Sequence, residues 1–237
     1  MSRIGIVTAM ETEVAPLVKG WRTALVETAG RRYKFFEREE AVVLCGGIGY
    51  EAGRRAAEAM IARAQPALLI AAGLAGGLRP QWTLGKTLVA VAVLDELTGR
   101  RLATAFGEGV VVSSRQIAGL AKKRELAARF DADVVDMEGF AVGEVAQAHG
   151  LPFLAAKAVS DDLGFELPPL QGFVDGEGKF EAGRFVAHAA VHPGWWGMIA
   201  RLKRHSEQAA EALAVLLRDL VRQHAGRSTV QAAALTR

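Results

Sequence analysis

Short runs of apolar residues alternate along the chain with segments whose apolar residues recur at helical spacing. The short runs predict buried strands, and the amphipathic segments predict helices. Predicted strands cover residues 4–7, 24–26, 33–36, 41–45, 67–71, 87–94, 110–112, 134–137 and 153–159. Predicted helices cover residues 11–19, 51–64, 115–130, 139–149 and 196–224. This alternation is typical of an α/β fold in which helices cover both faces of a mostly parallel sheet.

Less regular segments separate and follow these elements. The glycine-rich residues 73–77 predict a loop after the strand at 67–71, and residues 163–193 carry the turn signal Pro168-Pro169. No stretch has the composition of a linker between domains, so residues 1–225 are interpreted as one domain. The polar, alanine-rich residues 226–237 are expected to form a flexible tail.

Composition restricts the class of protein. The chain has 237 residues, of which 51% are hydrophobic, and this is ample for a packed core. No apolar run approaches the roughly 18 residues that a membrane span needs, and the first residues lack the features of a signal peptide. The single Cys45 cannot form an internal disulfide. We therefore expect a soluble, cytoplasmic protein without stable membrane insertion.

Several motifs that would indicate other chemistry are incomplete. The net charge is +3, and no face combines basic with aromatic residues, which argues against nucleic-acid binding. Gly85-Lys86-Thr87 lacks the upstream glycine of a phosphate-binding P-loop. His188 and His192 have the spacing of metal ligands on a helix, but no carboxylate completes a site. We expect neither a metal nor a cofactor.

Acidic residues follow several of the predicted strands. They are Glu11 and Glu13 after the first strand, Asp136 and Glu138 at the end of the strand at 134–137, and Asp161 and Asp162 after the last strand. Taken singly, each is better explained as a solvated surface carboxylate. Together, at the edge of the sheet where α/β proteins bind ligands, they favour acid–base chemistry on a polyhydroxylated substrate.

Five motifs stand in the order and spacing of the nucleoside phosphorylase superfamily. They are Ala9-Met10-Glu11-Thr12-Glu13-Val14, Gly47-Ile48-Gly49, Gly73-x-Ala75-Gly76-Gly77-Leu78, Asp136-Met137-Glu138-Gly139 and Val159-Ser160-Asp161. Over about residues 3–162 the sequence resembles the branch that holds 5′-methylthioadenosine/S-adenosylhomocysteine nucleosidases. The resemblance implies a three-layer αβα sandwich with a mixed, twisted central sheet, and a homodimer.

The resemblance also implies an activity, the cleavage of the N-glycosidic bond of a purine nucleoside, with adenine as the expected base. Asp161 would then be the general acid toward purine N7, a role that needs a raised pKa. Glu138 would accept the ribose hydroxyls, with Met137 packed under the sugar. Glu13 would orient or deprotonate an attacking water.

The implied pocket departs from the nucleosidase pattern at the nucleophile. The nucleophile or phosphate pocket would contain Lys157, Gly73, Leu74 and Ala75, and the remaining substrate pocket Met10, Ile48, Gln116 and Ile117. Leu74 replaces a serine, Lys157 replaces an arginine, and residues 113–117 lack the base-stacking phenylalanine. A lysine can hold phosphate as a point charge but not as a bidentate fork. Water and inorganic phosphate therefore both remain open as the nucleophile, with Arg31, Arg32 and Arg54 as further candidate anion ligands.

Two length differences point to the 5′ side of the nucleoside. The segment from residue 95 to residue 109 is short by family standards. The segment from residue 163 to residue 198 is longer than in the nucleosidases and is rich in aromatic side chains. The apolar Leu74 in the glycine motif and the Leu-Pro-Pro segment at 167–169 resemble hopanoid-associated phosphorylases, which act on adenosylhopane. We hypothesise a large apolar 5′ substituent; alternatively, the aromatic residues only cover the sheet. The other class considered is a non-catalytic nucleoside-binding protein of the same fold.

Overall fold

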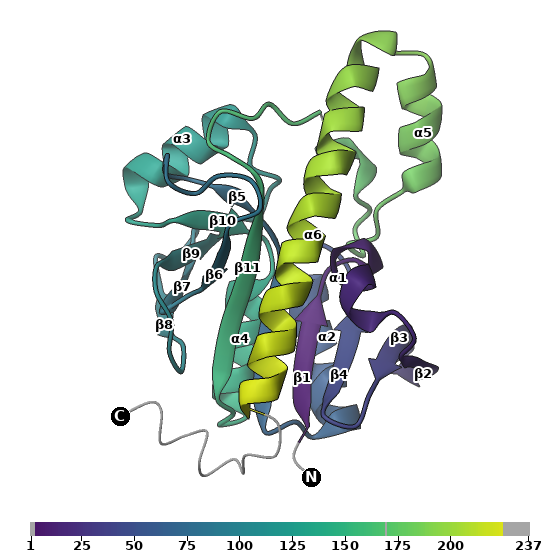
Figure 1. The fold of residues 1–237 in the computed structure, drawn as a ribbon, viewed down its shortest axis with the longest axis vertical. Coiled ribbons are helices and arrows are strands. Elements are labelled where there is room, and N and C mark those ends of the chain that lie inside the picture. Colours follow the sequence, from purple (N-terminus) through teal and green to yellow (C-terminus); the bar gives the residue numbers. More distant parts are fainter. Residues whose placement is uncertain (1–2, 169, 225–237) are drawn as a thin grey trace.

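The computed structural model describes residues 3–168 and 170–224, which form a mixed sheet of 11 strands with helices on both faces (Figure 1). This arrangement confirms the predicted three-layer α/β sandwich. The expected tail, residues 226–237, lies outside the described residues. No helix of the described chain combines the length and the apolar character needed to cross a membrane.

One half of the sheet is built around β1, which lies between two parallel neighbours. Its residues pair with β4 on one side and with the start of β5 on the other. An antiparallel ribbon of two strands then extends the β4 edge. The strands of this half are β1 (Ile4–Thr8), β2 (Arg22–Thr28), β3 (Arg31–Glu37), β4 (Ala41–Cys45) and β5 (Leu68–Gly77).

The other half branches from β5, which pairs in parallel with β11 along most of its length. The last two residues of β5 turn to pair with β10, where Gly76 and Gly77 face Val135 and Val134. Strands β9, β7 and β8 continue from β10, and β6 pairs with β11. Their bounds are β6 (Thr87–Val89), β7 (Ala92–Asp95), β8 (Arg101–Ala103), β9 (Val110–Ser113), β10 (Val134–Asp136) and β11 (Phe153–Asp161).

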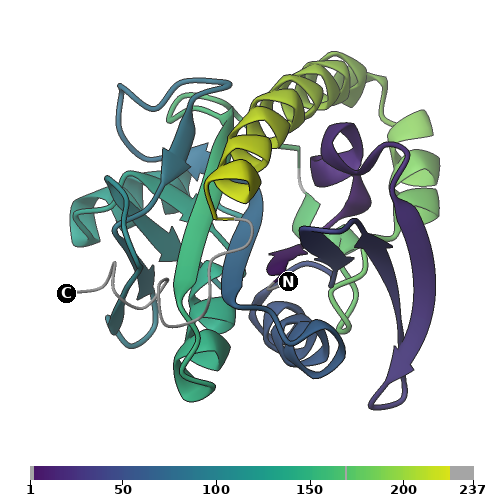
Figure 2. The same ribbon diagram turned by 60° about the horizontal axis from the view of Figure 1, so that its bottom comes forward.

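Helices form the two outer layers. Figure 2 shows α6 lying across one face of the sheet beside α1, with α2 and α4 on the opposite face. Leu213 and Leu217 of α6 are fully buried against Ile6 and Leu154, whereas Met60 and Phe140 fill the other layer. Each such side chain contributes about 1.5–3 kcal/mol when it leaves water. The helices are α1 (Glu11–Val18), α2 (Tyr50–Ala64), α3 (Leu120–Arg129), α4 (Gly139–Ala148), α5 (Ala182–Ala190) and α6 (Trp196–His224).

The predicted glycine loop at 73–77 is wrong, because these residues continue β5. Their small size serves close packing instead of a turn. A Cβ on Gly76 would lie 2.8 Å from Cε of Lys123, and one on Gly77 would lie 2.4 Å from the Trp82 carbonyl oxygen. Glycine is needed here because neighbouring elements approach the strand backbone directly.

One predicted helix and one segment predicted to be irregular also need correction. The helix expected at 115–130 begins only at Leu120, so residues 115–119 form a loop. Its first three N–H groups donate to the side chains of Glu96, Ser114 and Gln171. Residues 163–193, expected to be irregular, contain α5 and two short 3₁₀ helices, η1 (Leu170–Phe173) and η2 (Pro193–Trp195). The long final helix was predicted with the bounds that the structure has.

Candidate functional site

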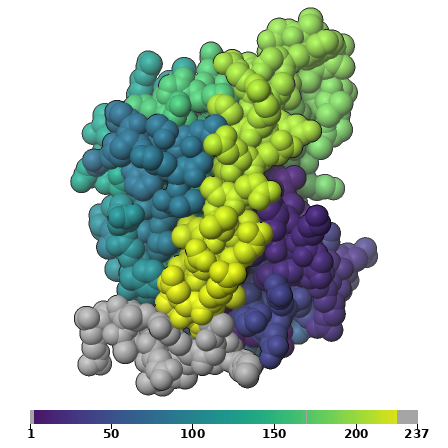
Figure 3. All heavy atoms as spheres, viewed as in Figure 1, coloured from purple at the N-terminus to yellow at the C-terminus, as the bar shows by residue number. Residues whose placement is uncertain are grey.

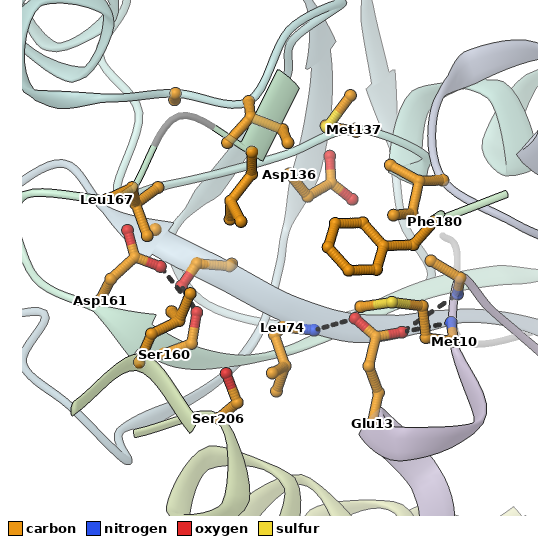
Figure 4. Close-up of a pocket in the computed structure, with 18 of the residues that line it drawn as sticks. Met10, Glu13, Leu74, Asp136, Met137, Ser160, Asp161, Leu167, Phe180 and Ser206 are labelled. Carbon is orange, nitrogen blue, oxygen red and sulfur yellow. Dashed lines mark hydrogen bonds between the residues drawn. The ribbon is translucent and has the colours of Figure 1, made fainter. Parts of the chain in front are cut away.

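A cavity of about 370 Å³ opens near the carboxyl ends of β1, β10 and β11 (Figure 4). All of the predicted site residues contribute to its wall except Lys157 and Gly73, which lie behind it. Those in the wall are Met10, Glu13, Ile48, Leu74, Ala75, Gln116, Ile117, Met137, Glu138 and Asp161. The chain thus brings residues from very different sequence positions to one place.

Glu13 lies in the first turn of α1, and its carboxylate turns back toward the end of β1. Oε2 accepts hydrogen bonds from Thr8 Oγ1 at 2.5 Å and from the backbone N–H groups of Ala9 and Met10 at 3.1 and 3.0 Å. Oε1 accepts one bond, from the Leu74 N–H at 3.2 Å. Since a carboxylate oxygen has two lone pairs, Oε1 keeps one acceptor position open.

Asp161 lies at the end of β11, where the pairing with β5 is irregular. The register shifts between Val159 and Asp161, so that Ser160 is left as an extra residue. A bulge of this kind re-aims the following side chain, here toward the cavity. Ser160 Oγ donates to Asp161 Oδ1 at 2.7 Å (Figure 4).

Lys123 of α3 is the partner of the other Asp161 oxygen. Its side chain is 0% exposed, and its Nζ forms an ion pair with Oδ2 of Asp161. The same Nζ donates to the carbonyl oxygens of Asp161 and Asp162 at 3.2 and 2.6 Å. Burial raises the pKa of Asp161, and the positive charge of Lys123 opposes that rise. The carboxyl group is therefore both held in place and biased toward keeping its proton.

A second buried lysine, Lys157, forms an ion pair with Asp136 at 2.6 Å, and the exposed fractions of the two side chains are 1% and 0%. Asp136 also accepts from Ser113 Oγ at 2.5 Å and from the Gly139 N–H at 2.8 Å. Burial by itself would lower the pKa of Lys157, but the neighbouring carboxylates, Asp136 first, raise it. The lysine charge is thus neutralised by the protein.

Glu138 immediately precedes α4, and its carboxylate faces the cavity. Oε1 accepts the Gly49 N–H at 2.6 Å. Burial, followed by the charge of Asp136, raises the pKa of Glu138 to about 8. Gly53 of α2 makes room for this side chain, because a Cβ there would lie 3.1 Å from Cβ of Glu138. Near neutral pH the group can therefore hold a proton.

The apolar part of the cavity wall comes largely from residues 163–206. This segment contributes Leu167, Leu170, Phe180, Phe185, Ile199 and Leu202, with Lys203 and Ser206 at the margin. Phe173 supports Phe185 from behind, with ring centroids 5.2 Å apart. Trp195 and Trp196 do not belong to the lining. Only part of the aromatic segment therefore contacts the cavity.

The arginines considered as anion ligands are engaged elsewhere or lie outside the wall. Arg31 pairs with Glu177 at 2.7 Å, and Arg54 pairs with Glu51 at 3.2 Å. Neither these two nor the exposed Arg32 is part of the cavity lining.

Sequence reasoning missed Lys123 and did not anticipate the partner of Lys157. A signal for Lys123 existed, because it lies one turn before the buried Leu126 on the inner side of α3. A lysine on the apolar side of a helix needs a buried partner, which is here Asp161.

Comparison with known proteins identifies the relatives of this fold. The family model of the phosphorylase superfamily matches residues 3–111 and 99–222. The chain belongs to the phosphorylase superfamily. Within this superfamily, a 5′-methylthioadenosine/S-adenosylhomocysteine nucleosidase of Marinomonas sp. (strain MWYL1) is 26% identical over 208 residues, which cover 71% of this chain and 89% of the relative.

Solved structures share the superfamily fold. The native futalosine hydrolase of Helicobacter pylori strain 26695 has a TM-score of 0.69 at 19% identity, covering 94% of this chain and 98% of its own. A 5′-methylthioadenosine/S-adenosylhomocysteine nucleosidase of Colwellia psychrerythraea 34H, in complex with adenine, has a TM-score of 0.71 at 19% identity, covering 95% and 97%. Together with the superfamily membership, the curated relative identifies the chain as an enzyme that cleaves the N-glycosidic bond of nucleosides.

Proposed function

We propose that the enzyme is a nucleosidase that hydrolyses a purine nucleoside, with water as the nucleophile. The observation that carries this proposal is that both buried cations of the site are already paired. Lys123 and Lys157 form ion pairs with Asp161 and Asp136, respectively. A phosphate dianion would have to compete with these carboxyl groups for the lysines, whereas a neutral water needs only an acceptor oxygen such as Oε1 of Glu13.

The arrangement supports a division of labour in the reaction. A water bound at the open lone pair of Glu13 Oε1 would give up a proton there and form a bond to C1′ of the ribose. The bond between C1′ and N9 would break with its electron pair going to the purine. Asp161, whose raised pKa favours the protonated form, would supply the proton to N7. Glu138 would bind the ribose hydroxyls beside Met137.

The 26%-identical Marinomonas relative, a 5′-methylthioadenosine/S-adenosylhomocysteine nucleosidase, supports adenine as the base. Oδ2 of Asp161 is buried against Lys123, so Oδ1 is the oxygen that would face purine N7. The 115–119 loop offers Gln116 and Ile117 next to the base but no aromatic ring.

The apolar wall supports a large apolar group on the 5′ carbon. Phe180 and Phe185 line the same cavity as the carboxyl groups. If the base reaches Asp161 and the ribose Glu138, these rings would be available to the 5′ group. A charged or strongly polar 5′ group would lose its hydration against these rings. An alkyl or polycyclic hydrocarbon chain would gain from burial.

The decisive experiment measures the base released from adenosine, 5′-methylthioadenosine and inosine, with and without inorganic phosphate, by chromatography. Release from the adenine nucleosides without phosphate is expected. Release that depends on phosphate would make the protein a phosphorylase and would contradict the proposed water step. Binding without release from any nucleoside would favour the non-catalytic class. Asp161→Asn should nearly abolish release while nucleoside binding persists.

The remaining expectations concern the state of the enzyme in the cell. We propose that it acts as a cytoplasmic homodimer and without a cofactor. Light scattering on the purified protein tests the dimer, and cell fractionation tests the location. Activity that survives dialysis against a chelator would agree with the absence of a metal requirement, and activity lost by dialysis and restored by a metal would contradict it.

A further inference from the structure

A helical hairpin projects from one end of the molecule. It consists of α5, η2 and the first turns of α6, and Figure 1 shows it standing above the level of the sheet. The elements that α5 contacts most are η1 and η2, whereas the later part of α6 lies on α1 and β11. The inner side of the hairpin thus packs against the protein, and its outer side faces solvent.

The outer side of the hairpin is apolar. Val186, Val191 and Trp196 are 65%, 72% and 58% exposed, respectively. The small exposed residues Ala187, Ala190 and Gly194 lie between them along the chain, and Gly197 follows Trp196. Over residues 182–200 the only charged side chain is Arg184. Exposed apolar side chains gathered in a segment with a single charge are typical of a surface that contacts an apolar or interfacial partner.

Basic side chains border this apolar face. Arg201, Lys203 and Arg204 follow directly after it on α6, and all three are exposed. Lys203 lies 3.8 Å from a carboxylate oxygen of Glu207. Arg201 lies over the Phe165 ring, 5.9 Å from its centroid, and within the described chain neither Arg201 nor Arg204 is ion-paired with a carboxylate. A tryptophan beside valines, bordered by cations, matches the chemistry of an anionic bilayer surface, where indole rings lie at headgroup level.

The same hairpin forms part of the cavity wall with its inner side. Phe185 of α5 and Ile199 and Leu202 of α6 line the cavity. Phe185 and Val186, about 100° apart around α5, therefore differ in their surroundings: Phe185 lines the site and Val186 is exposed to solvent. A hairpin placed at a lipid surface would hold the apolar end of the site against that surface.

We propose that this hairpin docks the enzyme reversibly onto anionic lipid bilayers, with Val186, Val191 and Trp196 inserted at headgroup depth and Arg201 and Arg204 on lipid phosphates. The space-filling view shows the hairpin as a projection, so that a flat bilayer can reach it without contacting the rest of the body (Figure 3). The idea that docking gives the enzyme access to substrate in the bilayer rests on the proposed apolar 5′ group. The binding to bilayers itself rests on the hairpin alone.

The test is co-sedimentation of the full-length protein with vesicles. The probes are vesicles of phosphatidylcholine alone and vesicles with about 30 mol% phosphatidylglycerol. Binding to the anionic vesicles is expected, with a decrease at high salt. The triple variant Val186→Ser/Val191→Ser/Trp196→Ser should lose at least about tenfold in partition coefficient. Arg201→Gln and Arg204→Gln should each lose about fivefold on anionic vesicles only.

Matched controls exist elsewhere on the surface. Leu25 in β2 and Leu97 after β7 are 69% and 64% exposed, so Leu25→Ser and Leu97→Ser remove comparable apolar surface away from the hairpin. Both controls should bind vesicles as the wild type does. Equal losses in controls and triple variant would overturn the proposal, as would a wild type that does not bind anionic vesicles.

Two further readouts separate the alternatives. If the triple variant has a lower mass than the wild type by light scattering and no form binds vesicles, the face joins copies of this chain, and the proposal is overturned. The substituted side chains do not line the cavity, so adenosine cleavage in vesicle-free buffer should be unchanged. A wild type that binds vesicles but cleaves no nucleoside would contradict the proposed function and leave the docking supported.

Discussion

The Nζ atom of Lys123 and the Oδ2 atom of Asp161 form an ion pair, although 37 residues of chain separate the two. Gly76 makes this contact possible, because a Cβ at that position would lie 2.8 Å from Cε of Lys123 and 3.1 Å from Asp161 Oδ2. Burial favours the protonated carboxyl group, and the lysine favours the carboxylate that remains after proton transfer. The pair is therefore suited to a group that must give up and regain a proton.

Lys123→Met should change the pH dependence of the reaction. Removing the positive charge raises the pKa of Asp161 further, so the fall of kcat/KM at high pH should move to higher pH. The maximum of kcat/KM should drop about 10- to 100-fold, because Asp161 becomes a weaker acid and loses the lysine that holds its carboxyl group in place. The control is Lys122→Met, since the neighbouring Lys122 pairs with Glu96 at 2.8 Å and lies outside the cavity. A high-pH limb that stays in place would exclude this role for Lys123.

Glu13→Gln should reduce kcat by about 10²- to 10⁴-fold with little change in the affinity for adenine. The amide keeps the shape of the carboxylate but has one acceptor oxygen for the four donors that now surround the group. Unfolding should therefore also become easier, by about 1–3 kcal/mol, because buried donors lose their acceptor. Single-turnover kinetics and thermal denaturation measure the two effects. The control is Glu11→Gln, which affects an exposed carboxylate that pairs with Lys34; near-wild-type turnover in Glu13→Gln would refute the proposed base.

Much of this site could be predicted from sequence because its carboxylates directly follow strands. Parallel strands end at the same edge of a sheet, so Glu13 after β1 and Asp161 at the end of β11 were expected to meet near one ligand. Their motif order also indicated the fold. The structure brings both groups to one cavity, and their chemical roles remain predictions for the experiments above.

The pairings between side chains could not be predicted from the sequence in the same way. Lys157 was expected in a nucleophile or phosphate pocket, yet it does not line the cavity and is paired with Asp136, which precedes it by 21 residues. The bulge at Ser160 shifts the strand register by one residue. No sequence pattern marks the position of this shift. Such features depend on distances between separate elements, and local patterns of apolar and polar residues do not contain those distances.

Glu138 should make the stability of the protein depend on pH. Its pKa is about 8 in the folded state against an ordinary value of 4.5, so the folded state holds a proton that the unfolded state has lost between these pH values. The free energy of unfolding should therefore decrease as pH rises from about 4.5 to 8 and level off above. Glu138→Gln should remove this decrease, leaving the variant about 1–3 kcal/mol more stable than the wild type at pH 9 and similar at pH 5. Denaturant titrations at both pH values measure this, with Glu51→Gln on the exposed surface of α2 as the control; parallel pH profiles for wild type and Glu138→Gln would contradict the assignment.

The length of the 5′ substituent should control catalytic efficiency. In a series of 5′-alkylthioadenosines, each added methylene should raise kcat/KM about fourfold, which corresponds to about 0.8 kcal/mol, until the apolar wall is covered. Phe185→Ala removes part of that wall, so the ratio of kcat/KM for the octylthio compound to that for the methylthio compound should fall at least about tenfold. Phe165→Ala is the matched control, because Phe165 lies in the same segment but does not line the cavity; its ring centroid lies 4.8 Å from that of His205. An efficiency that is independent of chain length, or an equal loss on both substrates in Phe185→Ala, would show that the wall serves the fold and not the 5′ group.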